Sequence, residues 1–189
     1  NTEVVGIEKD QKVWAVENRT RSYVIDADRI IIATGATENA LSFEGWTLPG
    51  VMTAGCAQTL INVHRVLPGH CVLMVGSGNV GVIVAYQLLQ AGAEVAAVIE
   101  AAPNLGGYGV HTAKVRRAGV PFFTSTTVIK AEGKESVERA VIANVDSKFI
   151  PIAGTEKILD VDTICIAVGL TPSIELASLA GCGMMYVPE

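Results

Sequence analysis

The chain has 189 residues, of which 50% are hydrophobic and 17% are charged, with a formal net charge of -5 at pH 7. This length suffices for one sizeable domain or for a domain with a piece of another, and the apolar balance excludes disorder and indicates a sheet buried on both faces. The acidic balance removes the attraction that dominates binding to nucleic acid, so we expect no nucleic-acid partner.

The first part of the chain predicts an antiparallel meander. Four short apolar runs separated by polar turns are expected to be strands, at residues 2–8, 12–18, 22–27 and 29–35. The last of these runs is expected to be fully buried. The following stretch contains the breakers Gly45, Pro49 and Gly50, and is the best candidate for a domain crossing. Residues 54–67 have helical spacing, and Pro68 ends this segment.

Residues 70–100 carry the strongest signal in the sequence. An apolar strand leads into Gly76-Ser77-Gly78-Asn79-Val80-Gly81, followed by a helix over about 79–91 and a strand over 94–99. This order predicts a nucleotide-binding βαβ unit, whose helix directs its free N–H groups at a phosphate. The first glycine permits the tight turn, the second admits the pyrophosphate, and the third lets the helix press against the strand. The alternative is an ordinary glycine-rich turn.

Glu100 ends the second strand of this unit, where an acid accepts hydrogen bonds from the ribose hydroxyls of a dinucleotide. A 2′-phosphate at about 4 Å would cost up to ~4 kcal/mol per charge pair at an effective dielectric of 20. Solvent reduces this cost to about 1–2 kcal/mol, roughly a tenfold preference. The sequence therefore favours NAD(H) over NADP. The alternative for Glu100 is a solvated acid at the end of a strand.

The rest of the chain predicts more α/β structure. We expect a short basic helix over 110–118 and a strand over 120–125 that is parallel to the first two strands. Antiparallel strands are expected at 127–133, 136–146 and 149–154, and an apolar strand over 160–168 returns to the sheet. A helix over 174–180 follows. The predicted fold class is a three-layer, Rossmann-like α/β domain with a parallel sheet plus an antiparallel meander.

The sequence predicts neither a redox or metal-binding role for the cysteines nor a membrane span. The four cysteines, Cys56, Cys71, Cys165 and Cys182, form no CxxC pair and no zinc-like spacing, which predicts reduced thiols, no metal site and a cytoplasmic location. Cys71 and Cys165 are expected to be small hydrophobes in buried strands. Glycines interrupt the uncharged stretch after Arg65, so no run of the ~20 apolar residues that a membrane span needs remains.

No catalytic residue can be assigned. The glycine turn binds a pyrophosphate but performs no chemistry, and the three histidines have no readable Ser, Cys or Asp partner: His64, His70 and His111. Lys114, Arg116 and Arg117 could reach a phosphate, but such residues more often form the solvated face of a helix.

Four segments resemble one superfamily when taken together. RIIIATGA, GWTLPGV, VLMVGSGNVG and DTICIAVGLTP are similar, in order and spacing, to the two-dinucleotide-binding-domain flavoproteins, the pyridine nucleotide-disulphide oxidoreductase superfamily. The resemblance implies FAD-domain-like flanks at 1–37 and 171–189 around an NAD(P)-binding domain at 38–170. It also implies that Gly169 and Leu170 lie close to the cofactor, and Ala101, next to the acid, is included in the predicted site.

A narrower resemblance concerns GWTLPGVMTAGCAQTL and GGYGVHTAKVRRAGVP. These segments resemble the FAD-containing α-type subunits of amine and amino-acid oxidising complexes, which implies FAD in the intact protein and other subunits as partners. Thioredoxin reductases carry a CxxC pair near Cys56, but the sequence here continues to Thr59 without a second cysteine. Disulphide reductases place a Glu at the position of Ile83. Both departures argue against disulphide reduction.

We therefore interpret the chain as the NAD(H)-binding part of an FAD-dependent oxidoreductase, a piece of a longer protein that is inactive alone. The intact enzyme is expected to exchange hydride between nicotinamide and FAD, or to oxidise an amine by FAD. One alternative is a non-catalytic module that holds ADP, ATP or NAD structurally. Another is a free-standing Rossmann dehydrogenase, which would need a Tyr/Lys or His/Asp set that the sequence lacks.

Overall fold

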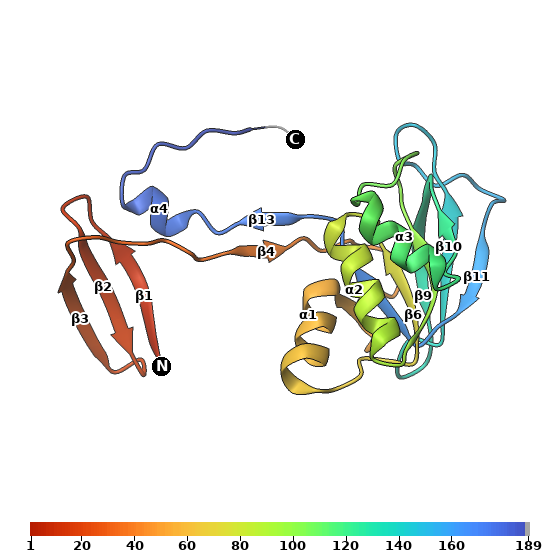
Figure 1. Ribbon diagram of the computed structural model, residues 1–189, viewed down its shortest axis with the longest axis horizontal. Coiled ribbons are helices and arrows are strands. Elements are labelled where there is room, and N and C mark those ends of the chain that lie inside the picture. The colour runs from red at the N-terminus through yellow and green to blue at the C-terminus, as the bar shows by residue number, and fades with distance from the viewer. Residues whose placement is uncertain (188–189) are drawn as a thin grey trace. The chain divides into compact units, whose positions relative to one another are not determined.

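The structure is a computed structural model that describes residues 1–187. The chain divides into two compact units: one is Glu38–Gly169, and the other combines Asn1–Thr37 with the segment from Leu170 onward. Figure 1 shows the elements of each unit.

The smaller unit contains the predicted meander. β1 (Thr2–Ile7), β2 (Lys12–Glu17) and β3 (Arg21–Asp26) form an antiparallel sheet in the order β1-β2-β3. Asn18 and Arg19 join β2 to β3 with left-handed backbone conformations, as a tight hairpin turn requires. Only Ile7 and Ala15 among the apolar residues of this sheet are buried, so both of its faces are largely uncovered.

The predicted fourth strand at residues 29–35 is wrong. This segment has no regular structure, and Ile31 is 92% exposed instead of buried. An apolar run forms a strand only where a neighbouring strand supplies hydrogen bonds, and none in the described chain pairs with it. β4 (Ala36–Glu38) follows and pairs with β13 (Leu170–Pro172), and α4 (Glu175–Leu179) confirms the last predicted helix.

The larger unit is built on a five-stranded parallel sheet with the order β5-β12-β6-β7-β8. Its strands are β5 (Val51–Thr53), β12 (Thr163–Ile166), β6 (Cys71–Val75), β7 (Glu94–Ile99) and β8 (Phe122–Phe123). Each neighbouring pair is parallel, which confirms the predicted direction of 120–125 and the return of 160–168 to the sheet.

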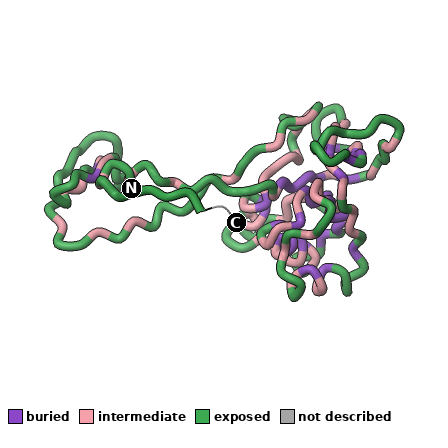
Figure 2. Tube along the Cα trace, turned by 90° about the horizontal axis from the view of Figure 1, so that it is seen from above, coloured by how far each residue is buried: buried purple, intermediate pink, exposed green. Residues whose placement is uncertain are grey.

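Helices cover one face of this sheet (Figure 1). They are α1 (Ala54–Thr59), continued by the π-helical turn η1 (Leu60–His64), α2 (Asn79–Gln90) and α3 (Gly109–Arg117). Val82, Ala85 and Leu88 of α2 pack against alternate sheet residues such as Met74 and Val98. Burial is concentrated in this unit (Figure 2). The predicted helices at 54–67, 79–91 and 110–118 are thus confirmed.

The other face of the sheet carries an antiparallel layer, ordered β11-β10-β9. Its strands are β9 (Thr126–Glu132), β10 (Arg139–Asn144) and β11 (Lys157–Asp160). Leu73 and Ile99 of the parallel sheet pack with Ile142 of this layer in a second core. Helices, parallel sheet and antiparallel layer together confirm the predicted three-layer fold class.

The third antiparallel strand is not where the sequence predicts it. Residues 149–154 contribute a single bridge through Pro151, and β11 takes the edge position instead. Asp146 Oδ1 accepts hydrogen bonds from the N–H groups of Lys148 and Ile150, at 2.8 and 2.9 Å, which bends the chain into a turn. Proline also lacks the N–H that a ladder needs.

The cysteines differ in accessibility. All four are unpaired: Cys56 and Cys182 are exposed, Cys71 is half-buried at the start of β6, and Cys165 is fully buried in β12. Burial, followed by the nearby Cys56, raises the pKa of the Cys165 thiol to about 12. Within residues 1–187, no helix is long and apolar enough to cross a bilayer.

Candidate functional site

The turn between β6 and α2 lies at the carboxyl edge of the parallel sheet. Gly76 has φ +105° and donates its N–H to the carbonyl of Ile99 at 2.8 Å. A Cβ at Gly76 would collide with the carbonyl oxygen of Ala167, and one at Gly81 would collide with that of Gly76. These two positions require glycine because the backbone segments of the turn, the helix and the β12 loop are in direct contact.

Gly78 has a different environment. It precedes the first helical residue of α2, and a Cβ built on it would meet no atom within 4 Å. The first N–H groups of α2 have no partner inside the helix and carry the positive end of its dipole. The turn therefore leaves open space beside unpaired donors, which is the arrangement that binds a phosphate.

Glu100 is bonded to the turn itself. Its Oε2 accepts hydrogen bonds from the N–H of Ser77 at 2.9 Å and from Ser77 Oγ at 2.7 Å, and its Oε1 accepts one from the N–H of Ala102 at 2.9 Å. The side chain is thus not a freely solvated acid at the end of a strand. A carboxylate offers about four acceptor sites, so Oε1 keeps capacity for a ligand hydroxyl.

The segment after β7 is fastened to the same turn. We name Ala101–Tyr108 the strap. Gly106 donates its N–H to Ser77 Oγ at 3.0 Å, and Tyr108 donates its N–H to Asn79 Oδ1 at 2.8 Å. Apart from Ala101, which belongs to the predicted site, the strap has no predicted role. No local pattern in the sequence indicates these two contacts, because each joins residues 29 positions apart.

Two of the three basic residues in the last turn of α3 lie against aromatic rings. Lys114 Nζ lies 5.5 Å from the centre of the Tyr86 ring, and Arg116 Cζ lies 5.3 Å from that of Phe122. A cavity of about 310 Å³ between α2 and α3 is lined by His111 and Lys114 but by no residue of the glycine turn. These contacts favour the interpretation that Lys114 and Arg116 belong to the outer face of a helix and do not bind a phosphate at the glycine turn.

The structure brings most of the predicted site together. Residues 76–81, Glu100 and Ala101 lie at one edge of the sheet, and the β12 loop reaches the turn through Ala167. Gly169 follows two residues later, with φ +127° and its carbonyl accepting the N–H of Asn39 at 3.0 Å. Leu170 belongs to the other compact unit, so its part in the site stays a prediction.

A glycine turn after the central strand of a parallel sheet, bonded to an acid that follows the neighbouring strand, gives the larger unit a Rossmann-like architecture. The chain belongs to the pyridine nucleotide-disulphide oxidoreductase family, whose sequence model matches residues 1–186. Members of this family are oxidoreductases that use FAD and NAD(P). The predicted family is therefore confirmed.

Similar proteins include subunits of oxidase complexes. The chain is 28% identical to hydrogen cyanide synthase subunit HcnB of Pseudomonas aeruginosa, over 96% of this chain and 42% of that protein. It is 27% identical to sarcosine oxidase subunit alpha of a Corynebacterium species, over 85% of this chain and 16% of that protein. A solved structure of a NAD-dependent persulfide reductase from A. fulgidus matches 95% of this chain and 33% of its own, with TM-score 0.68 and 26% identity. The chain thus spans less than half the length of each of these proteins.

Proposed function

We propose that this chain is the NAD(H)-binding part of an FAD-dependent oxidoreductase. The observation that carries the proposal is the contrast among the three glycines: Gly76 and Gly81 are fixed by backbone contacts, whereas Gly78 borders open space at the N-terminus of α2. That space is where the dinucleotide pyrophosphate would lie.

Electrostatics supports NAD(H) over NADP. Glu100 places a carboxylate at the end of β7, and Ala101–Tyr108 contains no Lys, Arg or His that could balance a 2′-phosphate. Repulsion of about 1–2 kcal/mol would then act against NADP, which corresponds to a preference of roughly tenfold.

The smaller unit is proposed to belong to an FAD-binding domain that is completed elsewhere in a longer protein. Residues 1–37 and 171–189 would be its flanks, with 188–189 outside the described residues. The exposed apolar side chains support this proposal, because uncovered large hydrophobic residues such as Val5, Val24 and Ile31 mark surfaces that need a partner. Other subunits of an oxidase complex are further proposed partners, as the names of the relatives suggest. We propose a cytoplasmic location.

A second candidate function is a module that holds a nucleotide without turning it over. Two features argue against disulphide reduction and are compatible with this module. Cys56 has no second cysteine at CxxC spacing, and Ile83 stands where disulphide reductases carry a glutamate. In this role the chain would hold ADP, ATP or NAD for structural reasons, and the flavin of the intact protein would take electrons from another substrate.

Calorimetric titration of Gly78→Ala with NADH tests the site. The added methyl meets no protein atom, so folding should be preserved, but it would occupy the space of the pyrophosphate. We expect NADH affinity to fall at least tenfold. The matched control is Gly109→Ala, which also adds a methyl in open space. If Gly78→Ala binds NADH with unchanged affinity, the glycine turn is not part of the nucleotide site. If ADP binds as tightly as NADH, the structural module is favoured instead.

A further inference from the structure

A cavity of about 310 Å³ lies between the neighbouring helices α2 and α3 (Figure 1). Residues three or four positions apart share one face of a helix, and the cavity wall formed by α2 follows this spacing. Ile83 and Tyr86 make the apolar part of this wall, and Gln87 and Gln90 make its polar part. The volume lies at the lower end of the range for small-molecule pockets.

The opposite wall, formed by α3, carries the positive charge of the cavity. His111 and Lys114 line it from one face of this helix. The ammonium of Lys114 lies 5.5 Å from the centre of the Tyr86 ring, which holds the charge at the cavity wall. No residue that lines the cavity is acidic, and within residues 1–187 Lys114 forms no ion pair with a carboxylate. The cavity therefore differs in charge from the chain as a whole, which is acidic.

The hydrogen-bonding groups of the cavity include an excess of donors. Gln58 of α1 donates a side-chain N–H to Oε1 of Gln87 at 3.0 Å, so the amide oxygen of Gln87 is engaged while its NH₂ group remains a donor. The ammonium of Lys114 has three donors and no acceptor. A molecule between the two helices therefore meets N–H donors and a positive charge together with the apolar surface of Ile83 and Tyr86.

We propose that this cavity binds a small organic carboxylate, at a site separate from the glycine turn. Lys114 would pair with the carboxylate, while Ile83 and Tyr86 would contact the hydrocarbon part of the ligand. Inorganic phosphate fits less well, because it would leave these two side chains without a contact. No residue from Gly76 to Gly81 lines the cavity, so the inference goes beyond the proposed function and does not depend on it.

Titration with benzoate, followed by NMR of the backbone amides, tests this site. Benzoate combines a carboxylate with an apolar ring, whereas benzyl alcohol keeps the ring without the charge and acetate keeps the charge without the ring. The variant Lys114→Met removes the positive charge and keeps an unbranched side chain. Arg117→Met is the matched control, because Arg117 is exposed in the same turn of α3 and does not line the cavity.

We expect benzoate to shift the amide signals of residues 82–90 and 111–114 in a saturable way. Its affinity should exceed that of acetate and of benzyl alcohol by roughly tenfold, because each of these probes lacks one of the two contacts. Lys114→Met should lose roughly tenfold in benzoate affinity, the usual effect of removing a hydrogen bond to a charged group. Arg117→Met should bind benzoate like the unmodified chain.

Four results would overturn the proposal. They are the absence of saturable benzoate binding, equal affinities for benzoate and acetate, an unchanged affinity in Lys114→Met, and displacement of benzoate by NADH, which would place benzoate at the nucleotide site. The comparison of the three probes uses the unmodified chain, so the proposal can be refuted even if Lys114→Met does not fold.

Discussion

Ser77 and Glu100 are joined by two hydrogen bonds to one oxygen, from the Ser77 N–H at 2.9 Å and from its hydroxyl at 2.7 Å. Glu100, which follows β7, and the glycine turn, which follows β6, are thus held together as one unit. Because Ser77 Oγ also accepts the N–H of Gly106, this unit includes the strap.

Replacement of Ser77 by alanine should destabilise the larger unit. The change leaves the N–H of Gly106 without its acceptor and removes one donor from Glu100. We expect a loss of about 1–3 kcal/mol in the free energy of unfolding, the usual cost of an unsatisfied buried polar group. Urea denaturation measures it. Ser147→Ala, at an exposed turn, is the control and should change stability by less than about 0.5 kcal/mol. Equal midpoints for both variants would contradict the role of Ser77.

Gly81→Ala should be poorly tolerated. Its Cβ would collide with the carbonyl oxygen of Gly76 and approach Ala167 Cβ to 3.3 Å, so α2 would have to move away from the sheet. Overpacking of this kind costs about 1–3 kcal/mol or more. Thermal unfolding followed by circular dichroism should show a clear drop in Tm relative to Gly109→Ala. A Tm equal to that of this control would show that the close contact is not needed.

Cys165 predicts a loss of stability at alkaline pH. Burial raises the pKa of its thiol to about 12, whereas an unfolded thiol titrates near about 8.5. The unfolded chain therefore loses its proton first, so the stabilisation is complete below about pH 8.5 and declines as the pH rises toward 12. Urea midpoints between pH 8 and 11 should fall more steeply for the unmodified chain than for Cys165→Ala. If the urea midpoint falls equally with pH in the unmodified chain and in Cys165→Ala, the raised pKa of Cys165 is contradicted.

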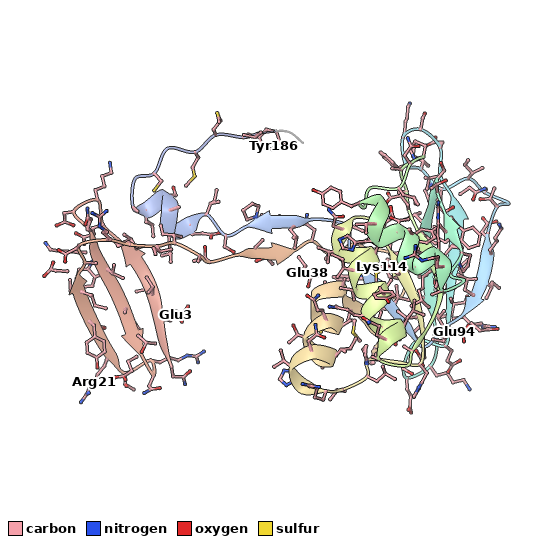
Figure 3. All side chains as sticks on the ribbon, in the orientation of Figure 1. Glu3, Arg21, Glu38, Glu94, Lys114 and Tyr186 are labelled. Atoms are coloured by element: carbon pink, nitrogen blue, oxygen red, sulfur yellow. The ribbon has the colours of Figure 1, made fainter. Side chains whose placement is uncertain are left out.

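Glu100→Gln should relax the discrimination between NADH and NADPH. The amide keeps the length of the side chain but removes the charge that repels a 2′-phosphate. We expect the ratio of the two dissociation constants to move from about tenfold toward one. The control is Glu94→Gln, at the amino end of the same strand (Figure 3), which should leave the ratio unchanged. An unaltered ratio in Glu100→Gln would assign the preference to other residues.

The sequence predicts the larger unit well because its signals are local. β7 has the predicted bounds Glu94–Ile99, and α2 begins at the predicted Asn79. In both elements the apolar period and the flanking glycines agree with the tertiary packing. The predicted strand at 29–35 fails for the opposite reason: its apolar residues need a neighbouring strand that the described chain does not supply.

The site is only partly predictable for a related reason. The glycine positions follow from local backbone demands, and the spacing to Glu100 follows from the βαβ unit. The bond from Gly106 to Ser77 joins residues 29 positions apart through a loop without regular structure, and no periodic pattern reports it. The same holds for the bond from Tyr108 to Asn79, so the strap could be found only in three dimensions.

The most direct test of the central claim is a calorimetric titration of the unmodified chain with NADH and, separately, with NADPH. Binding at the turn from Gly76 to Gly81 beside Glu100 predicts a saturable, single-site isotherm for NADH and an affinity for NADPH that is about tenfold lower. Equal affinities, or no binding of NADH, would contradict the claim that this turn and its acid form an NAD(H) site.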